Sequence, residues 1–507
     1  MAHGRIILAV TGVALLGAMF GVAAPPPAPA AAAAPAGYPI SGIDVSAYQG
    51  PIDWNAVAAG GAQFAYIRAS EQAGTPDAFF AANYQAAKAH GLYAGAYHRA
   101  RPDVSGGAEQ ADYLIDHAAY ADDGRTLPPM LDIEWPRSNW TGLDACYNLT
   151  PAQISAWIRA FVDRVAARTG RLATIYTNPN WWNPCTANNA TFGANPLFNS
   201  GYLPAPPAPP AGWTTWTLWQ YANAGALPGD QDVFNGDYAA LARLAGGVPF
   251  GLLAAANGRY VTAEHTGTSP LIANRTAIGT WERFDLIDAG GGYVALRSHA
   301  NGRLVTADHA GTSPLIANRL LIGEWEKFTV VVNADGTVSF QAKANGRYVT
   351  AEHAGASSLI ANRTVIGVWE RFSQVPLPGL ISLRAEVNGK YVTADNGGAL
   401  PLIANRDAVW GWELFDQVNA GGGYIAVRAR ANNKYVTADN SGASPLIASR
   451  TSVGTWEKFR AVVRPDARIS LLAANGRYVT ADQGGAAPLI ANATAVATPQ
   501  LFRPTPR

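Results

Sequence analysis

Two carboxylates stand one residue apart in an apolar run, as Asp132 and Glu134 in the segment Leu131-Asp132-Ile133-Glu134-Trp135. Alternate side chains of a β-strand point to the same face, so both acids would project together, about 6 to 7 Å apart. Like charges that close resist ionising together, which favours one protonated acid beside one anion near neutral pH. Such a pair can cleave a glycosidic bond, although two solvated acids at a strand end would give the same pattern.

The elements that must position these acids form an alternating pattern over residues 38–246. Helices are predicted at Asp77–His90, Gly107–Tyr120 and Thr150–Arg168, and the last opens with Thr150-Pro151, a capping residue followed by proline. The predicted strands are Gly42–Ser46, Phe64–Ala69, Tyr93–His98, Met130–Glu134, Ala173–Thr177, Leu197–Tyr202, Thr215–Tyr221 and Gln231–Phe234. Eight strands with interleaved helices predict a closed β/α barrel, with fewer helices than strands.

In such barrels the active site lies at the C-terminal ends of the strands. That rule selects acids from three distant segments, listed here in chain order: Asp44, then Asp132 and Glu134, then Asp230 and Asp232. We therefore expect these acids to meet at one rim.

Aromatic residues gather at or just beyond the same strand ends: Tyr66, Tyr97, Tyr176, Trp181, Trp182, Trp219 and Tyr221. Flat rings can stack on the apolar faces of sugar rings while their polar atoms hydrogen-bond. Core packing explains any single one of them equally well. As a group near the acids, they favour a sugar site, and we select Tyr66, Tyr97, Tyr176, Trp219 and Tyr221 as substrate-binding residues.

Composition narrows the functional classes. The 507 residues exceed one domain, and 37 basic against 36 acidic residues favour no nucleic-acid partner. The eight histidines do not cluster at metal-ligand spacing and no glycine-rich phosphate loop occurs, so we expect neither metal nor cofactor. Two cysteines, Cys146 and Cys185, predict a disulfide in an exported protein rather than a reactive thiol or metal site.

The N-terminus has the pattern of an export signal. His3 and Arg5 precede the apolar stretch Ile6–Ala24, which ends in small residues, and an Ala/Pro-rich spacer follows over residues 25–37. We assign residues 1–24 to a cleaved signal peptide, with an uncleaved membrane anchor as the alternative, because the stretch approaches the length of a membrane span. No later segment is apolar enough to cross a bilayer, so we expect a secreted monomer, free or associated with a cell wall.

From residue 248 onward, six near-copies of one unit follow at intervals of 43 or 44 residues, each marked by an asparagine: Asn257, Asn301, Asn345, Asn388, Asn432 and Asn475. About four short strands per copy suit either a six-bladed propeller or two β-trefoils. Copies two and five both enter through Gly-Gly-Gly-Tyr, whereas copies one and four enter through short proline-bearing segments. This higher period of three favours two trefoils, over residues 248–376 and 377–507.

Residues 41–246 resemble the glycoside hydrolase family 25 muramidases, also called CH-type lysozymes. The motifs that carry the resemblance follow in the family's order: Gly42-Ile43-Asp44-Val45-Ser46-x-x-Gln49-Gly50, Phe64-Ala65-Tyr66-Ile67, Gly95-Ala96-Tyr97-His98, Leu131-Asp132-Ile133-Glu134 and Trp219-Gln220-Tyr221. Cys146 and Cys185 also resemble a cysteine pair of some members. The resemblance implies a flattened, TIM-like barrel of eight strands with fewer helices.

By this resemblance Glu134 would be the general acid/base, and Asp132 would hold it and help to stabilise the reacting sugar. Asp44 and Asp232 would complete an acidic floor, with Asp232 preferred to Asp230 as the better match to the family's last-strand aspartate. The resemblance leaves open whether an aspartate or the substrate's own acetamido group attacks the anomeric carbon. Both routes need one protonated acid and one anion.

The chain also departs from the family pattern. Arg68 stands where lysine is usual, Gln72 where glycine is usual and Arg99 where phenylalanine is expected, and the sixth strand, Leu197–Tyr202, lacks the usual tryptophan. Because arginine's planar fork imposes its own geometry, these changes bear on subsite shape and substrate preference. The C-terminal copies resemble fascin-like β-trefoil repeats and lack the Gln-x-Trp motif of ricin-type lectins.

The sequence therefore predicts a secreted lysozyme that cleaves the β-1,4 bond between N-acetylmuramic acid and N-acetylglucosamine in peptidoglycan. One alternative is a chitinase-like glycosidase, but the upstream aspartates of that signature would fall in Leu127–Met130, which contains no acid. A second alternative is a non-catalytic cell-wall-binding protein on a decayed barrel. The repeats are predicted to bind wall or other carbohydrate, with an inert spacer as the alternative, because several weak sites on one array would add avidity.

Overall fold

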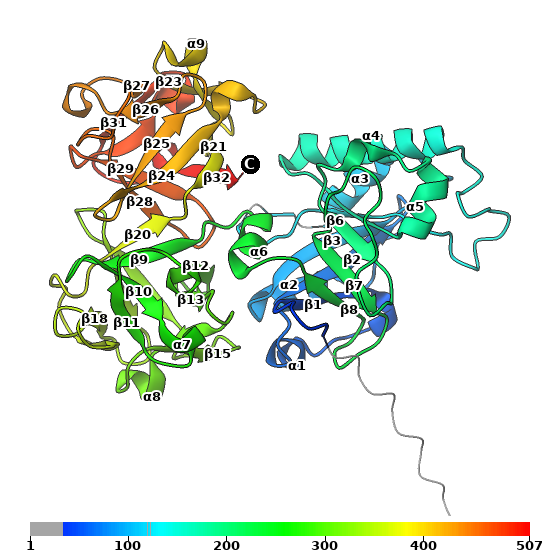
Figure 1. The fold of residues 1–507 in the computed structure, drawn as a ribbon, viewed down its shortest axis with the longest axis horizontal. Helices are drawn as coiled ribbons and strands as arrows, with labels where there is room; N and C mark the ends of the chain where they lie inside the picture. The colour runs from blue at the N-terminus through cyan, green and yellow to red at the C-terminus, as the bar shows by residue number, and fades with distance from the viewer. Residues whose placement is uncertain (1–33, 119, 122, 507) are drawn as a thin grey trace, which may run out of the picture. The chain divides into compact units, whose positions relative to one another are not determined.

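The computed structural model describes residues 34–118, 120–121 and 123–506 (Figure 1). The predicted signal peptide (1–24) and most of the predicted spacer (25–37) lie outside these ranges and stay predictions. Across the described ranges, no helix combines the length and the apolar character that a membrane span requires.

Eight strands close into a barrel in chain order, which confirms the predicted closed barrel. Its strands are β1 (Ser41–Val45), β2 (Phe64–Glu71), β3 (Tyr93–Arg99), β4 (Met130–Asp132), β5 (Thr174–Thr177), β6 (Leu197–Ser200), β7 (Leu218–Ala222) and β8 (Asp230–Phe234). The helices that accompany them are α1 (Trp54–Ala59), α2 (Phe80–Ala89), α3 (Gly107–His117), α4 (Pro151–Thr169), α5 (Pro179–Thr186) and α6 (Tyr238–Leu244).

One strand breaks the parallel order of the barrel. Strands β1 to β7 pair in parallel in sequence, but β8 runs antiparallel to both of its neighbours, β1 and β7. Asp230 therefore lies opposite Asp44, and Asp232 lies opposite Gly42. The beginning of β8, rather than its end, shares the barrel mouth with the C-terminal ends of the other strands.

The alternation of side chains along β2 shows how the barrel is filled. Phe64 and Tyr66 belong to the apolar cluster that also contains Met130 and Phe198, whereas Ala65 and Ile67 belong to the cluster that packs with the helices. A Cβ added at Gly95 on the neighbouring strand would lie 2.2 Å from the Tyr66 ring, so this ring needs a glycine beside it. Aromatic side chains thus fill the barrel interior below the mouth.

The predicted start of the longest helix is confirmed. Thr150 accepts a hydrogen bond from the backbone of Gln153, whose side chain bonds back to Thr150, and Pro151 occupies the first helical position. The helix ends at Thr169 and is capped by Gly170, whose φ of +69° is a left-handed conformation that glycine adopts without strain. Its buried face is Ile154, Trp157, Ile158, Phe161, Val162 and Val165.

From Phe250 to Pro506 most of the regular secondary structure consists of short β-strands joined by turns. The first three copies contain β9 (Phe250–Ala254), β10 (Arg259–Ala263), β11 (Leu271–Arg275), β12 (Arg283–Asp288), β13 (Val294–Ser298), β14 (Leu304–Thr306), β15 (Ile316–Arg319), β16 (Phe328–Val332), β17 (Val338–Ala342), β18 (Tyr348–Ala351), β19 (Leu359–Arg363) and β20 (Phe372–Pro376). The last three contain β21 (Gly379–Ala385), β22 (Tyr391–Ala394), β23 (Leu402–Arg406), β24 (Phe415–Gly421), β25 (Tyr424–Ala429), β26 (Lys434–Thr437), β27 (Ile447–Arg450), β28 (Phe459–Val463), β29 (Ile469–Ala473), β30 (Tyr478–Ala481), β31 (Leu489–Ala493) and β32 (Phe502–Pro506). One-turn helices α7 (Glu264–Gly267), α8 (Asp308–Gly311) and α9 (Asp395–Gly398) interrupt them.

The strand pairings group the copies in threes. Antiparallel pairs link β9, β12, β13, β16, β17 and β20 into one closed ring, because β20 pairs back to β9. In the same way β21, β24, β25, β28, β29 and β32 form a second ring, closed by β32 and β21. Each copy adds one hairpin to its ring, for example β10 with β11.

The repeated asparagines close the same two rings. A Cβ at Gly267 in copy one would lie 2.2 Å from the amide nitrogen of Asn301 in copy two, so the turn of each copy packs directly on the next asparagine. The remaining contacts pair Gly311 with Asn345, Gly355 with Asn257, Gly398 with Asn432, Gly442 with Asn475, and Gly485 with Asn388. The third copy of each set therefore returns to the first, and these asparagines serve the structure of the repeat.

Candidate active site

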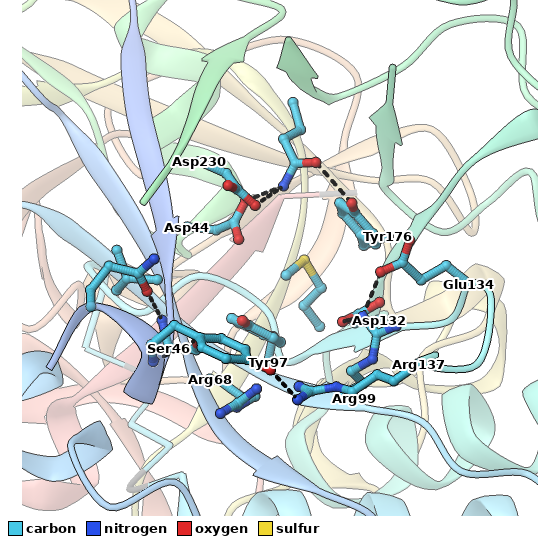
Figure 2. Close-up of a pocket in the computed structure, with 15 residues that line it drawn as sticks. Asp44, Ser46, Arg68, Tyr97, Arg99, Asp132, Glu134, Arg137, Tyr176 and Asp230 are labelled. Atoms are coloured by element: carbon cyan, nitrogen blue, oxygen red, sulfur yellow. Dashed lines mark hydrogen bonds and ion pairs between the residues drawn. The ribbon is translucent and has the colours of Figure 1, made fainter. Parts of the chain in front are cut away.

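A pocket of about 230 Å³ opens at the barrel mouth, where the acids from distant strands meet (Figure 2). Asp44 comes from β1 and Asp230 from β8, while Asp132 ends β4 and Glu134 follows two residues later. Figure 2 shows Asp44 and Asp230 on one side of the hollow and Asp132 and Glu134 on the other. The complete lining is Asp44, Val45, Ser46, Tyr48, Gln49, Arg68, Tyr97, Arg99, Met130, Asp132, Glu134, Arg137, Tyr176, Gln220 and Asp230.

Asp132 and Glu134 share one cation. Nη1 of Arg99 donates to Oδ2 of Asp132 at 3.1 Å and to Oε1 of Glu134 at 2.5 Å. The Asp132 side chain is 8% exposed and that of Glu134 is 21% exposed, so Glu134 is the member of this pair that a ligand in the pocket can reach. Tyr147 donates from its hydroxyl to the backbone carbonyl of Glu134 at 2.8 Å, which holds the main chain there.

Asp44 and Asp230 share an amide. Nε2 of Gln220 on β7 donates to Asp44 at 2.6 Å and to Asp230 at 2.9 Å. The Gln220 carbonyl oxygen accepts from the Tyr176 hydroxyl at 2.8 Å and from the Tyr202 hydroxyl at 3.2 Å. Two tyrosines thus orient the amide so that its nitrogen faces the two carboxylates.

The protonation of these acids is governed first by burial. Burial raises the pKa of Asp132 to about 7, although Arg99 acts in the opposite direction. Burial also raises the pKa of Asp230 to about 6, with Glu134 adding to the effect. The pKa of Asp44 is raised well above its usual range by burial and then by Asp230. The pocket therefore retains protons on carboxyl groups near neutral pH, as acid–base chemistry requires.

The structure brings most of the predicted site residues together: Asp44, Asp132, Glu134, Tyr97 and Tyr176 line the pocket. Asp232, which the sequence interpretation preferred to Asp230, does not line it. Its side chain is fully buried, and neither carboxylate oxygen has a hydrogen-bond partner in the described part of the chain. The reason is the direction of β8: because this strand enters from the mouth, Asp230 lies at the pocket and Asp232 lies two residues deeper.

Three of the predicted sugar-stacking residues lie away from the pocket. Tyr66 is fully buried and donates its hydroxyl to the carbonyl of Pro128 at 3.1 Å. The Trp219 indole is fully buried and donates to the carbonyl of Gly201 at 2.9 Å. Tyr221 packs edge-on against Trp219. Their contacts are those of core residues. Core packing is the alternative explanation given above, and position in the sequence does not distinguish it from a sugar site.

Sequence reasoning missed the groups that hold the acids in place. Gln220 is the central residue of the Trp219-Gln220-Tyr221 motif, and its membership of this motif is the sequence signal that indicates a role in the site. Arg68 and Arg99 were noted only as departures. Arg68 lines the pocket and donates from Nε to Asp77 at 2.9 Å. Gln72, where glycine is usual, adopts a φ of +50°, the left-handed conformation that explains the usual glycine.

The predicted disulfide is present between Cys146 and Cys185. The disulfide joins α5 to the loop after Glu134. The Trp181 indole of α5 also donates to the carbonyl of Ala145 in this loop, at 2.8 Å. This loop carries Tyr147, so the bond stabilises the segment that contacts the Glu134 backbone. Among the residues with described positions, no group of three or more His, Cys, Asp or Glu could hold a metal ion.

The barrel mouth gathers four carboxyl groups, and the pKa is raised for three of them, Asp44, Asp132 and Asp230. Such an arrangement suits cleavage of a glycosidic bond. Comparisons with known proteins agree: residues 43–230 match the family described as glycosyl hydrolases family 25. Lysozyme M1 of Streptomyces globisporus is 42% identical over 213 residues, 41% of this chain and 71% of that protein. The N,O-diacetylmuramidase of Chalaropsis sp is 41% identical over 214 residues, 41% of this chain and all of that protein.

A third relative, the N,O-diacetylmuramidase of Arthroderma benhamiae, is 37% identical over 209 residues, which are 41% of this chain and 87% of that protein. The chain therefore belongs to glycosyl hydrolases family 25 and is a glycoside hydrolase of the muramidase class. The matched region is the barrel, and the two strand rings that follow it lie beyond the family match.

Proposed function

We propose that this protein is a lysozyme that hydrolyses the β-1,4 bond between N-acetylmuramic acid and N-acetylglucosamine in peptidoglycan. The observation that carries the proposal is the meeting of four acids, Asp44, Asp132, Glu134 and Asp230, around one open pocket. Membership of family 25 supports the same substrate, as do the names of its relatives, which are two N,O-diacetylmuramidases and one lysozyme.

Glu134 is proposed as the general acid/base, because its side chain is the more exposed member of the Asp132–Glu134 pair. Since burial raises the pKa of Asp132 to about 7, the two carboxyl groups together retain a proton near neutral pH. That proton would pass to the glycosidic oxygen as the bond to the leaving sugar breaks. A water molecule would then return a proton to the pair when it attacks the anomeric carbon.

Asp132, Asp44 and Asp230 are proposed to face the positive charge that develops on the sugar ring. Carboxylates fixed in a pocket stabilise an oxocarbenium-like transition state without reorganising during the reaction. Gln220 holds Asp44 and Asp230 in place through one nitrogen, so their position does not depend on the substrate. Tyr97 and Tyr176 line the same hollow and would contact the sugar.

The test is the substitution Glu134→Gln, assayed by release of soluble fragments from purified peptidoglycan. We expect turnover to fall by about 1,000-fold, while the thermal unfolding temperature stays near that of the wild type. Mass spectrometry of wild-type products reports which bond is cleaved. Fragments that end in N-acetylglucosamine rather than N-acetylmuramic acid at the reducing end, or chitin cleaved faster than peptidoglycan, would refute the proposed bond. Stoichiometric wall binding without fragments would instead support a non-catalytic binding protein.

The C-terminal region is proposed to form two β-trefoils, residues 248–376 and 377–507, that hold the enzyme on the wall. Two closed rings of six strands, each built from three copies, support the trefoil assignment. Export by cleavage of residues 1–24 is part of the same proposal, and N-terminal sequencing of the exported protein tests it.

One copy offers a specific surface for wall binding. Trp410 is 75% exposed and Trp412 is 42% exposed. Trp410 stands where copies one, two, three and five have glycine, so the repeat itself does not require an indole there. We expect Trp410→Gly in the Glu134→Gln background to weaken co-sedimentation with purified wall by about 10-fold, through loss of ring stacking on sugar. An unchanged binding curve would leave the repeats as a spacer.

A further inference from the structure

Arg99 occupies the centre of the acid–base pair. It ends β3 and lies directly opposite Asp132 in the parallel register of β3 and β4. Its side chain is only 14% exposed, and it reaches three acceptors: Asp132, Glu134 and the backbone carbonyl of Trp135, the last at 2.9 Å from Nη2. Among the residues whose positions are described, Arg99 is the only cation that forms an ion pair with Asp132 or Glu134.

The geometry of these contacts fixes the direction of the Glu134 side chain. Nη1 donates to the Glu134 carboxylate, while Nη2 donates to the backbone carbonyl of Trp135. The planar guanidinium therefore fixes the Glu134 side chain relative to the main chain that follows it. The Trp140 ring packs near the guanidinium, with its centroid 5.9 Å from the central carbon of Arg99. A lysine could supply the charge but not this fork of donors.

We propose that Arg99 is a positioning residue that sets the orientation of Glu134 toward the scissile bond and couples it to Asp132. The proposal rests on the proposed role of Glu134 and extends it to a residue that departs from the family pattern. Arg99 need not touch the substrate, because it acts through the carboxylate that does.

The proposal predicts a defect in turnover rather than in substrate affinity. For Arg99→Met, we expect kcat on soluble peptidoglycan fragments to fall by about 100-fold while KM changes by less than about 3-fold, because a reacting group displaced by about 1 Å loses that much rate. Arg99→Lys should recover only part of the loss. Free guanidinium added to Arg99→Ala should raise kcat by about 10-fold in a saturable manner, since it can occupy the vacated volume between the two acids.

Arg101 provides a matched control. Its guanidinium also lies over Trp140, 4.2 Å from the ring centroid, but it pairs with Asp103 rather than with the catalytic acids. We expect Arg101→Met to keep kcat within about 3-fold of the wild type. Equal loss of kcat in the Arg99 and Arg101 variants would show that only the packing of Trp140 matters, and would overturn the proposal.

A second measurement is independent of turnover. Arg99 lowers the pKa of Asp132, which also faces Glu134, Arg137 and, across the pocket, Asp44. Removing Arg99 should therefore move the Asp132-dependent step in the pH dependence of thermal unfolding to higher pH. The inference is refuted if the Arg99→Met protein keeps the wild-type kcat and its Asp132-dependent step in thermal unfolding stays at the wild-type pH. Absence of turnover on peptidoglycan by the wild-type protein would instead refute the proposed substrate.

Discussion

The two sides of the pocket hold their acids with different partners. Asp132 and Glu134 share a guanidinium, which carries a full charge, whereas Asp44 and Asp230 share the neutral amide of Gln220. Charge alone would give the arginine side the lower pKa values. The pKa is nevertheless raised on both sides: to about 7 for Asp132, to about 6 for the less buried Asp230, and well above the usual range for Asp44. Burial therefore outweighs the partner's charge, and the partners chiefly fix orientation.

Neutralising the two aspartates of β8 one at a time tests which of them acts in the pocket. We expect Asp230→Asn to lower kcat on peptidoglycan by about 100-fold, because it removes negative charge that faces the developing cation. Asp232→Asn should lower kcat by less than about 3-fold, since that side chain is buried outside the pocket. The opposite ranking in steady-state assays would support Asp232, the residue preferred from the sequence.

Replacing the shared amide should have an intermediate effect. Gln220→Leu removes the donor between Asp44 and Asp230, and we expect kcat to fall by about 10-fold. Because the hydrogen bond from Gln220 lowers the pKa of Asp44, its loss should raise that pKa further. Gln220→Glu, which keeps the shape but adds a third acid, should be more damaging than Gln220→Leu. A pH–rate profile of each variant distinguishes these outcomes, and equal activity of the two would contradict the role of the amide.

The smallest expected effect is on stability. The folded-state pKa of Asp132, about 7, and that of Asp230, about 6, lie above the unfolded value near 3.9. Between these limits the folded protein binds more protons at these two groups than the unfolded chain does, so their contribution to the free energy of unfolding decreases as pH rises from about 4 to about 7. Buried His98, whose pKa is lowered to about 4, contributes with the opposite sign. Denaturant titrations of the wild type and of Asp132→Asn at several pH values isolate the Asp132 contribution: the wild type should lose more stability than the variant as pH rises, and the reverse difference would contradict the burial of Asp132.

Much of the barrel could be predicted from the sequence. Apolar runs separated by helical patterns marked each strand within a few residues, and Thr150-Pro151 marked the start of α4. The acids Asp44, Asp132 and Glu134 followed from their places at strand ends. The aromatic residues were harder, because Tyr66 and Trp219 have the same local pattern as Tyr97 and Tyr176 and differ only in depth within the barrel.

The choice between Asp230 and Asp232 shows what sequence could not supply. Both residues lie on the same face of β8, two positions apart, so alternation does not separate them. The direction of the strand decides, and direction is a property of the pairing with β1 and β7. Arg99 illustrates a second limit: its partners Asp132 and Glu134 lie more than thirty positions further along the chain and meet it only when β3 and β4 pair.

The contacts between successive turns and asparagines limit how the C-terminal region can change in length. The turn at Gly355 in the third copy contacts Asn257 in the first copy, and the turn at Gly485 in the sixth copy contacts Asn388 in the fourth. Gain or loss of a single copy would leave one turn without its asparagine contact and would leave one strand ring open. Descendants of this gene should therefore lengthen or shorten by whole triplets, and a recombinant protein with a triplet deleted should express better than one with a single copy deleted.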